Sequence, residues 1–417
     1  MKKLKIGVFG GNIRGVDLAK AFMLLDCEIV AVCERREERY DVIHEHLGKD
    51  VPIFDKFEDF IEVEMDACIL ANFFHEHAPF AIECFRRNIH VFSECISNGT
   101  MAEGVELVRA FENTKSIYFL AENYPQMIFN REIQRVCASG TLGKIMYAEG
   151  EYNHPGDPMD TRFKKDYNYF EGHWRNYLPR TYYVTHSLGP IMRATGATPK
   201  IVTAFSIPAP VADNVPSASY SCDRASIMMT QNDDGSVFRF TGCAAFGGHH
   251  NAYRVCGTDG SIENVRGLDN KVVLHYNDWT KPEGAEDVNY YSPGWNDPDE
   301  KLIIETGHGG ADFITARMFV ECIRENKQPE HPFNLHSAIA MSSVAILAHR
   351  SALEGGKPYE IPDFTKEDER KKYENDRISP FLKEDGTCDI PCCTDPTYKP
   401  TETQLKLYRK MVLGIDE

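Results

Sequence analysis

The sequence predicts an α/β protein in which a doubly wound parallel sheet is followed by an α+β domain with a large, mainly antiparallel open sheet. Three observations lead to this prediction. Strand and helix patterns alternate over residues 1–125, the strands of that part are apolar throughout, and long strands of alternating polarity begin near residue 143. Strands without a polar face indicate a parallel sheet covered on both sides, whereas alternating strands indicate an antiparallel sheet with one free face.

The first part of the chain alternates five expected strands with helices. The strands are KIGVFG, CEIVAVCE, MDACILAN, IHVFSE and SIYFLAEN, and the helices between them include VDLAKAFMLL, HAPFAIECFRR and AEGVELVRAF. This order is the pattern of a doubly wound nucleotide-binding sheet, the Rossmann fold.

The second part is expected to form the open sheet. Its strands are KIMYAEGEYNH, KIVTAFSIP, SIMMTQNDDGSVFRFTGCAAF and KVVLHYND. Helices follow near residue 311 (ADFITARMFVECIREN) and from 335 to 356, and we expect the second of them to pack back on the first domain. The remaining residues are charged and interrupted by prolines, with a closing helix at TETQLKLYRKMVL. We therefore expect a nucleotide-binding Rossmann domain at 1–125, a substrate domain at 126–365 and a C-terminal extension at 366–417.

The composition excludes several classes of partner. The 417 residues carry a formal net charge of −17, and an acidic protein is repelled by nucleic acid and by anionic membranes. The first residues, MKKLKIGVFGG, have too short an apolar run for an export signal, and no stretch approaches the ~18 apolar residues of a membrane span. The thirteen cysteines are odd in number, so we expect free thiols in a reducing, cytoplasmic compartment.

No metal site is expected. His249 and His250 are adjacent, so on a strand they point to opposite faces and cannot chelate one ion. Cys388, Cys392 and Cys393 lie close together in the tail, but no second pair of ligands is near them in the sequence.

The turn after the first strand, Gly10 to Gly15, is an imperfect G-x-G-x-x-G motif in which Asn12 takes the middle position. Asparagine tolerates the left-handed backbone angles that glycine adopts, so the turn could still admit a pyrophosphate. Glu34 ends the second strand, 19 positions past Gly15, where a carboxylate can bind both ribose hydroxyls of NAD and repel the 2′-phosphate of NADP. Arg35 beside it weakens that preference. NAD is favoured over NADP; a glycine turn without a cofactor is the alternative.

A two-domain chain with these motifs resembles the Gfo/Idh/MocA family, named for glucose–fructose oxidoreductase and inositol dehydrogenase. The resemblance covers residues 1 to about 363 and rests on IGVFGGNIRG, ANFFHEHAPFAIECFRRNIHVFSE, AEN and GTLGKIMYAEGEY. It implies bound NAD, a small carbohydrate substrate and a homo-oligomer. The residues that we assign to the cofactor side on this basis are Gly10, Asn12, Ile13, Arg14, Glu34, Arg35, Asn72, His75, His77, Glu94, Cys95, Asn123 and Trp174.

One segment departs from the dehydrogenases of this family. Where they have Glu-Lys-Pro, with a lysine taken to assist proton transfer, this chain has Glu94-Cys95-Ile96. The segment YYVTHSLGPIMRATG, residues 182–196, is similar to the Tyr-x-x-His-x-x-Gly-Pro of the glycosidase branch of the family. That branch, the NAD-dependent α-N-acetylgalactosaminidases and their relatives, also lacks the lysine. EGEYNH, HWRNY, GHGGADF and EIPDF add to the resemblance.

The glycosidase resemblance implies a redox-assisted elimination. Hydride leaves the sugar C3, the ketone acidifies the C2 proton, the C1 group is expelled, water adds and the hydride returns. Tyr152 is the candidate base at C2, with its pKa lowered by Arg175 or by hydrogen bonds. His186 is the candidate that accepts or orients the C3 hydroxyl proton. Glu122 and Tyr183 would hold sugar hydroxyls, and Arg175 an oxygen that carries charge.

Each of these residues has a purely structural alternative. Tyr152 could pack on the sheet face and His186 could cap a helix, while Cys95 is expected to be inert packing or a polar contact at the cofactor. Two other functions also stay open. One is an NAD(P)-dependent sugar or polyol dehydrogenase that uses another base, and the other is a silent sensor that binds NAD or sugar without turnover.

Overall fold

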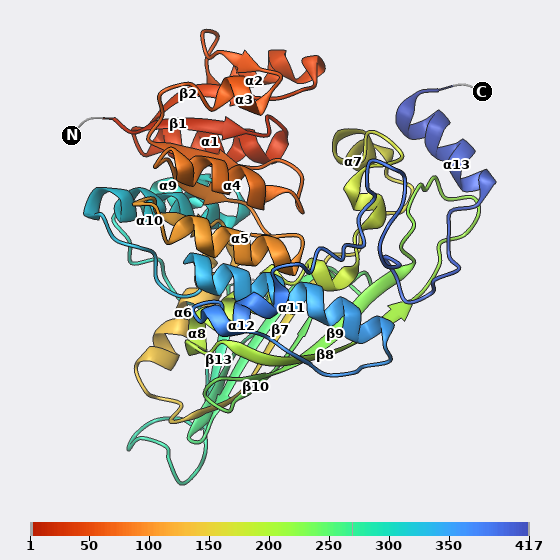
Figure 1. Cartoon of the computed structure of the whole chain (residues 1–417). Coiled ribbons are helices and arrows are strands. Elements are labelled where there is room, and N and C mark those ends of the chain that lie inside the picture. Colours follow the sequence, from red (N-terminus) through yellow and green to blue (C-terminus); the bar gives the residue numbers. More distant parts are fainter. Residues whose placement is uncertain (1–2, 269, 416–417) are drawn as a thin grey trace.

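The structure is a computed structural model that describes residues 3–268 and 270–415. It contains two sheets, with the smaller N-terminal sheet above and the larger sheet below it in Figure 1. Among the described residues, no helix is both long and apolar enough to cross a membrane.

The N-terminal sheet has six parallel strands in the order β3-β2-β1-β4-β5-β6, which confirms the expected doubly wound sheet. Its strands are β1 Lys5–Phe9, β2 Glu28–Cys33, β3 Ile53–Phe54, β4 Ala67–Leu70, β5 His90–Ser93 and β6 Tyr118–Leu120. Its helices are α1 Ile13–Leu24, α2 Tyr40–Leu47, α3 Phe57–Phe60, α4 His77–Arg86 and α5 Met101–Phe111. The edge strand β3 was not predicted, because two residues are too few to show a pattern.

Local sequence determines where these helices begin. α5 starts at a capping box, in which the Thr100 hydroxyl accepts from the Glu103 amide while the Glu103 carboxylate accepts from the Thr100 amide. α1 starts at Asn12, whose side chain accepts from the amide of Gly15. Asn12 is therefore extended (φ −70°, ψ 179°) and does not use the left-handed angles that asparagine tolerates. The positive φ of the turn, 103°, belongs to Gly10.

The larger sheet has nine strands in the order β14-β13-β12-β11-β7-β10-β9-β8-β15. Only the β7–β10 pair is parallel among the pairings of its named strands, so the expected mainly antiparallel sheet is confirmed. The strands are β7 Ile145–Asn153, β8 Pro199–Pro208, β9 Asp223–Asn232, β10 Val237–Thr241, β11 His250–Gly257, β12 Gly260–Asn264, β13 Val272–Tyr276, β14 Val288–Tyr291 and β15 Tyr359–Glu360.

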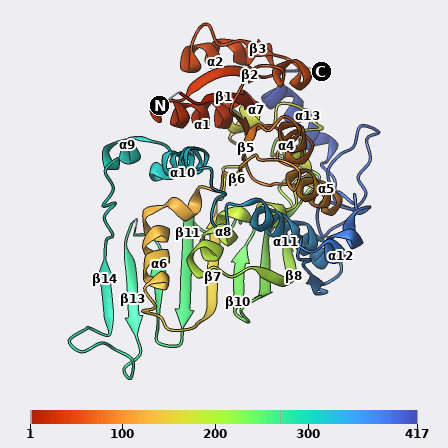
Figure 2. The ribbon, with the colours of Figure 1, turned by 60° about the vertical axis from the view of Figure 1, so that its left-hand side comes forward.

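Helices cover the face of the larger sheet that is turned towards the N-terminal domain. α6 (Ile128–Ala138), α8 (Thr185–Thr195) and α11 (Leu335–Leu353) contact strands of this sheet, and Figure 2 shows α8 and α11 at its upper end and α6 alongside its strands. α11 runs mainly along β8 and also touches α5 and β6, so it lies against both sheets rather than on the first domain alone.

The helix that enters the N-terminal core is α10 (Ala311–Glu325), which packs on α1. Its Phe319 contacts the rings of Phe22, Phe92 and Phe119 in the core beneath the parallel sheet. The remaining helices are α7 Thr161–Tyr167, α9 Glu300–Glu305, α12 Glu367–Arg370 and α13 Glu402–Tyr408. α13, in the C-terminal extension, lies beside α7 in Figures 1 and 2, and the Tyr408 hydroxyl bonds the carbonyl of Asn168.

Candidate active site

The turn between β1 and α1 forms a cradle that fits a dinucleotide. A Cβ at Gly10 would lie 2.3 Å from the carbonyl oxygen of Ala71, and one at Gly15 would lie 1.8 Å from that of Gly10. Only glycine therefore permits this close packing, which leaves the N-terminus of α1 at the carboxyl edge of the parallel sheet, where such sheets bind phosphates. Glu34 stands at the end of β2 and is 8% exposed. The backbone amide of Arg36, rather than a group of Arg35, donates a hydrogen bond of 3.0 Å to the Glu34 carboxylate.

Several residues assigned to the cofactor side present polar atoms that have no partner within the described residues. The Asn72 and Asn123 side-chain oxygens, His75 Nδ1 and His77 Nε2 are all buried and without a hydrogen bond. Buried polar atoms are normally satisfied, so four such atoms are the sign of a polar ligand. The ring of His75 also stacks on Phe381 of the C-terminal extension at 4.1 Å, and burial lowers its pKa to about 3.

An ion network lies beside this cradle. Arg14, on α1, contacts the Glu94 carboxylate after β5 and, at 2.7 Å, Asp312 on α10. Asp312 also accepts from the Asn123 amide and pairs with His308, both at 2.7 Å. Burial acts to raise the pKa of Asp312, but Arg14 and His308 outweigh it and hold that pKa well below its usual range. The Arg14 guanidinium thus forms ion pairs with two carboxylates.

The His308–Asp312 pair predicts a pH-dependent stability. The hydrogen bond that His308 donates to the Asp312 carboxylate raises the pKa of His308 above 6.5. The contribution of the pair is therefore fully present below about pH 6.5 and is lost as the pH rises through the raised value. Replacing His308 with glutamine should lower the melting temperature by about 2 °C at pH 6 and by less at pH 9, as measured by scanning calorimetry.

His336 provides the control for this experiment, because burial lowers its pKa. His336→Gln should cost no stability at pH 6. If His308→Gln lowers the melting temperature by the same amount at pH 6 and at pH 9, the charge on His308 does not contribute to stability.

The second cluster centres on a carboxylate–histidine pair. Glu122 follows β6 and is fully buried, and its two oxygens lie 2.9 and 3.0 Å from Nδ1 of His186 on α8. Burial raises the pKa of Glu122, but His186, Thr185 and the Tyr124 amide outweigh it and hold that pKa below its usual value. An ionised carboxylate can only accept, so Nδ1 of His186 carries the proton and Nε2 is free to accept another.

Three tyrosines surround this imidazole. Tyr124 stacks on His186 at 4.1 Å, Tyr152 meets it edge-on at 4.9 Å and Tyr183 lies at 5.4 Å. Gly150 on β7 permits this arrangement, because a Cβ there would lie 2.0 Å from the carbonyl oxygen of Ser187 on α8. The structure thus brings together the predicted Glu122, Tyr152, Tyr183 and His186, and it adds Tyr124.

Two expectations about Tyr152 differ from the structure. Burial, followed by the neighbouring Tyr183 and Tyr124, raises the pKa of Tyr152 well above 10 rather than lowering it. Arg175 does not act on Tyr152, because its guanidinium lies over the Trp174 ring at 4.4 Å. Its charge instead opposes the effect of burial on the pKa of Tyr183.

Cys95 touches the same carboxylate. Its thiol donates to Glu122 Oε2 over 3.3 Å, and burial, together with Glu122 and Glu94, raises its pKa well above 9. The group is therefore a neutral donor, and the thiolate that nucleophilic chemistry needs is disfavoured.

Comparison with known proteins finds a family model that matches part of the second half of the chain. Residues 243–371 match the family model described as Glycosyl hydrolase 109, C-terminal domain. This part of the chain is similar to the C-terminal domain of GH109 proteins. Similar proteins include a Glycosyl hydrolase family 109 protein 1 from Akkermansia muciniphila, 24% identical over 412 residues that cover 88% of this chain and 83% of that one. Another, from Saccharopolyspora erythraea, is 24% identical over 394 residues that cover 87% and 83%.

Solved structures share the fold of most of this chain. A levoglucosan dehydrogenase in complex with NADH and levoglucosan matches with a TM-score of 0.72 and 16% identity, over 87% of this chain and 100% of that one. Myo-inositol 2-dehydrogenase from Lactobacillus plantarum matches with a TM-score of 0.63 and 16% identity, over 86% and 100%. Together with the GH109 match, these findings confirm the resemblance to the glycosidase branch of the Gfo/Idh/MocA family.

Sequence reasoning missed three residues of the site. Tyr124 follows directly on the AEN motif, and its aromatic ring beside that motif was the available signal. His308 and Asp312 are four residues apart in GHGGADF, but the helix that joins them begins only at Ala311, so their pairing follows from the three-dimensional structure.

Proposed function

We propose that the protein is an NAD-dependent carbohydrate enzyme that cleaves a glycoside by transient oxidation at C3, deprotonation at C2 and elimination at C1. The observation that carries this proposal is the Glu122–His186 pair, with Cys95 bonded to the same carboxylate. The position that holds a proton-transferring lysine in the family's dehydrogenases here holds a thiol that donates to Glu122. The imidazole of the second domain supplies the base instead.

NAD would accept the hydride from C3 and return it within each turnover. His186 Nε2 would take the C3 hydroxyl proton, since Nδ1 is held by Glu122. Tyr152, whose ring faces the imidazole edge at 4.9 Å, is placed to exchange the C2 proton. The relatives named for GH109, and a dehydrogenase with NADH and a sugar bound, support a carbohydrate substrate and this cofactor. The buried Glu34 favours NAD over NADP, because its carboxylate would meet the 2′-phosphate.

Turnover in heavy water tests the reaction. The purified protein is incubated with nitrophenyl glycosides, and the released sugar is analysed by mass spectrometry and NMR. We expect deuterium at C2 and no accumulation of reduced nicotinamide, because hydride is returned before release.

The competing functions give different results in the same experiment. A net dehydrogenase would form reduced nicotinamide in proportion to substrate and release no nitrophenol. A glycosidase that uses two carboxylates would cleave without exchange at C2, because its bond breaks at C1 alone. Cleavage without C2 deuterium would overturn the proposal.

A further inference from the structure

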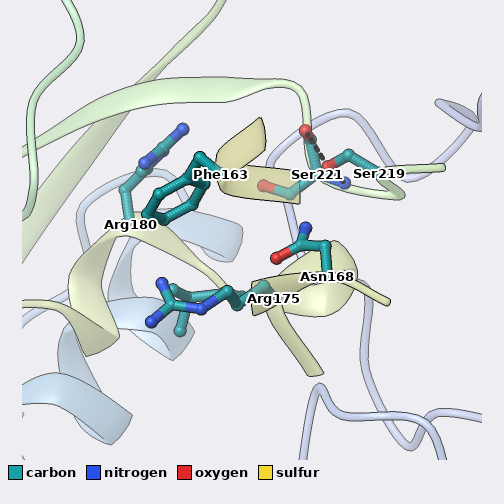
Figure 3. Close-up of a pocket in the computed structure, with 7 residues that line it drawn as sticks. Phe163, Asn168, Arg175, Arg180, Ser219 and Ser221 are labelled. Carbon is teal, nitrogen blue, oxygen red and sulfur yellow. Dashed lines mark hydrogen bonds between the residues drawn. The ribbon is translucent and has the colours of Figure 1, made fainter. Parts of the chain in front are cut away.

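A cationic cavity is lined by Arg175 and Arg180, which shortly precede Tyr183 in the chain. Its volume is about 190 Å³, and it is bounded by the residues after α7, the segment 209–224 and two tyrosines of the C-terminal extension, Tyr398 and Tyr408. Figure 3 shows Arg175 and Arg180 on one side of the hollow and Asn168, Ser219 and Ser221 on the other. The volume suits a charged substituent or a single ring, since pockets for larger ligands span roughly 300–1,000 Å³.

The charge of this cavity is unusual for an acidic protein. Four cations line it: Lys164, Arg175, Arg180 and Arg224. None of the described residues that line it is acidic, and none of the four cations forms an ion pair with a described carboxylate, although the chain carries a net charge of −17. The four side chains are partly buried. Cations that are withdrawn from water normally have anionic partners, so a group of four without a carboxylate partner indicates that an anion from outside completes the site.

The contacts of these cations keep them in place without neutralising them. Arg180 donates through Nε to the Asp223 carbonyl at 2.9 Å, and Arg224 to the Ala209 carbonyl at 3.0 Å. The Lys164 ammonium donates to the Pro216 carbonyl at 2.6 Å. Burial, and the charge of Arg224, lower the pKa of Lys164 to about 8, although Asp157 and Asp160 oppose this.

A neutral group adds an unused donor. The Ser221 hydroxyl is buried and has no partner within the described residues. The Ser221 hydroxyl lies on the wall opposite the arginines in Figure 3. Hydroxyl groups beside guanidinium groups are the donors that carboxylate, sulfate and phosphate oxygens require.

The cavity adjoins the site through the turn that carries Tyr183. Arg180 opens that turn (η4, Arg180–Tyr182), and the Tyr183 carbonyl accepts from the amide of Cys243 at 3.0 Å. The charge of Arg175 reaches both the Tyr183 hydroxyl and the Cys243 thiol. Arg175 therefore lines the cavity and also acts electrostatically on the residues at the edge of the candidate active site.

We propose that this cavity is a subsite for an oxyanion group of the substrate, so that the enzyme acts on acidic carbohydrates that carry a carboxylate, sulfate or phosphate. This inference rests on the proposed function in one respect, namely that the Glu122–His186 cluster binds a sugar. Free inorganic oxyanions share the same chemistry, and the experiment separates the two sources.

Calorimetry with the full-length protein and its cofactor measures binding without turnover. The titrants are a 6-sulfated monosaccharide, its unsulfated counterpart and inorganic sulfate. We expect the sulfated sugar to bind at least tenfold more tightly than the other two. Arg224→Gln and Lys164→Gln should each weaken binding of the sulfated sugar about tenfold, because each deletes one charged donor. Arg254→Gln, on β11 and away from the cavity, is the matched control and should change nothing.

Ser221→Ala is a second variant that breaks no hydrogen bond of the described structure and should still weaken the sulfated sugar severalfold. Equal binding of sulfated and neutral sugars would overturn the subsite. So would tight binding of inorganic sulfate with no preference for the sulfated sugar, which would indicate a site for a free ion. If the wild type prefers the sulfated sugar and the cavity variants abolish that preference, the subsite is supported. This holds even if the protein cleaves no glycoside, in which case only the proposed reaction fails.

Discussion

His186→Asn is expected to lower kcat for glycoside cleavage by roughly 10²–10⁴, the range of a lost general base. Asparagine places an amide nitrogen near the position of Nδ1, so the bond to Glu122 can persist, but nothing replaces Nε2. The C3 hydroxyl then keeps its proton, and hydride transfer stops with it. Single-turnover absorbance should therefore show no transient of reduced nicotinamide, while the amount of bound NAD stays unchanged.

A second histidine–glutamate pair provides a matched control. His250 Nε2 lies 2.8 Å from Glu151, and Glu151 is adjacent to Tyr152 on β7, so its side chain points to the opposite face of the sheet. His250→Asn should keep nearly full activity. Glu122→Gln, which removes the charge and keeps the shape, should lower kcat about 10–100-fold. Activity of His186→Asn within threefold of the wild type would show that the imidazole is not the base.

Tyr152→Phe is expected to separate the two proton transfers. The ring still packs against Tyr124 at 5.3 Å and against His186, so the fold should survive the loss of one hydroxyl. Hydride transfer should proceed and reduced nicotinamide should accumulate, whereas expulsion of the leaving group and deuterium incorporation at C2 should each fall roughly 10²–10³-fold. Stopped-flow absorbance and product analysis in heavy water measure these steps.

The environment of Tyr152 makes this experiment decisive. Burial keeps the Tyr152 hydroxyl neutral in the resting site. Tyr152 must lose this proton before it can act as a base, and ionising a buried hydroxyl costs free energy. If Tyr152→Phe still exchanges C2 at the wild-type rate, His186 performs both transfers. Tyr177, a buried tyrosine stacked on Tyr220 outside the cluster, supplies the control variant Tyr177→Phe, which should behave as the wild type.

Periodicity predicted the sheets well because each strand shows its environment in its own residues. The apolar runs of β1, β4 and β5 indicate burial on both faces, and these strands lie at the centre of the parallel sheet. β3 and β15 have two residues each and are recognised as strands only because they pair with neighbouring strands. β11 was missed because it begins in the polar GGHHN segment.

The sequence predicted which residues form the candidate site, but it did not predict how they contact one another. Glu122 and His186 were both named from the sequence, yet their hydrogen bond joins residues 64 positions apart and depends on the approach of α8 to β7. Asn12 illustrates a different limit, because the same amide suits a left-handed turn and a helix cap, and the Gly15 amide decides between them. The pKa of Tyr152 depends on burial among other tyrosines, which no spacing reveals.

The position of Phe319 and Phe333 in the N-terminal core has a consequence for biosynthesis. These side chains pack with Phe92 and Phe119, and the Phe333 carbonyl accepts from the Leu120 amide at 2.8 Å. A nascent chain that has released β6 therefore still exposes one side of its parallel sheet. At about 5–20 residues per second, α10 and Phe333 leave the ribosome roughly 10–40 s later. During that interval the unfinished half must be shielded by the ribosome or by a chaperone, and it becomes a closed unit only when the second half has been made.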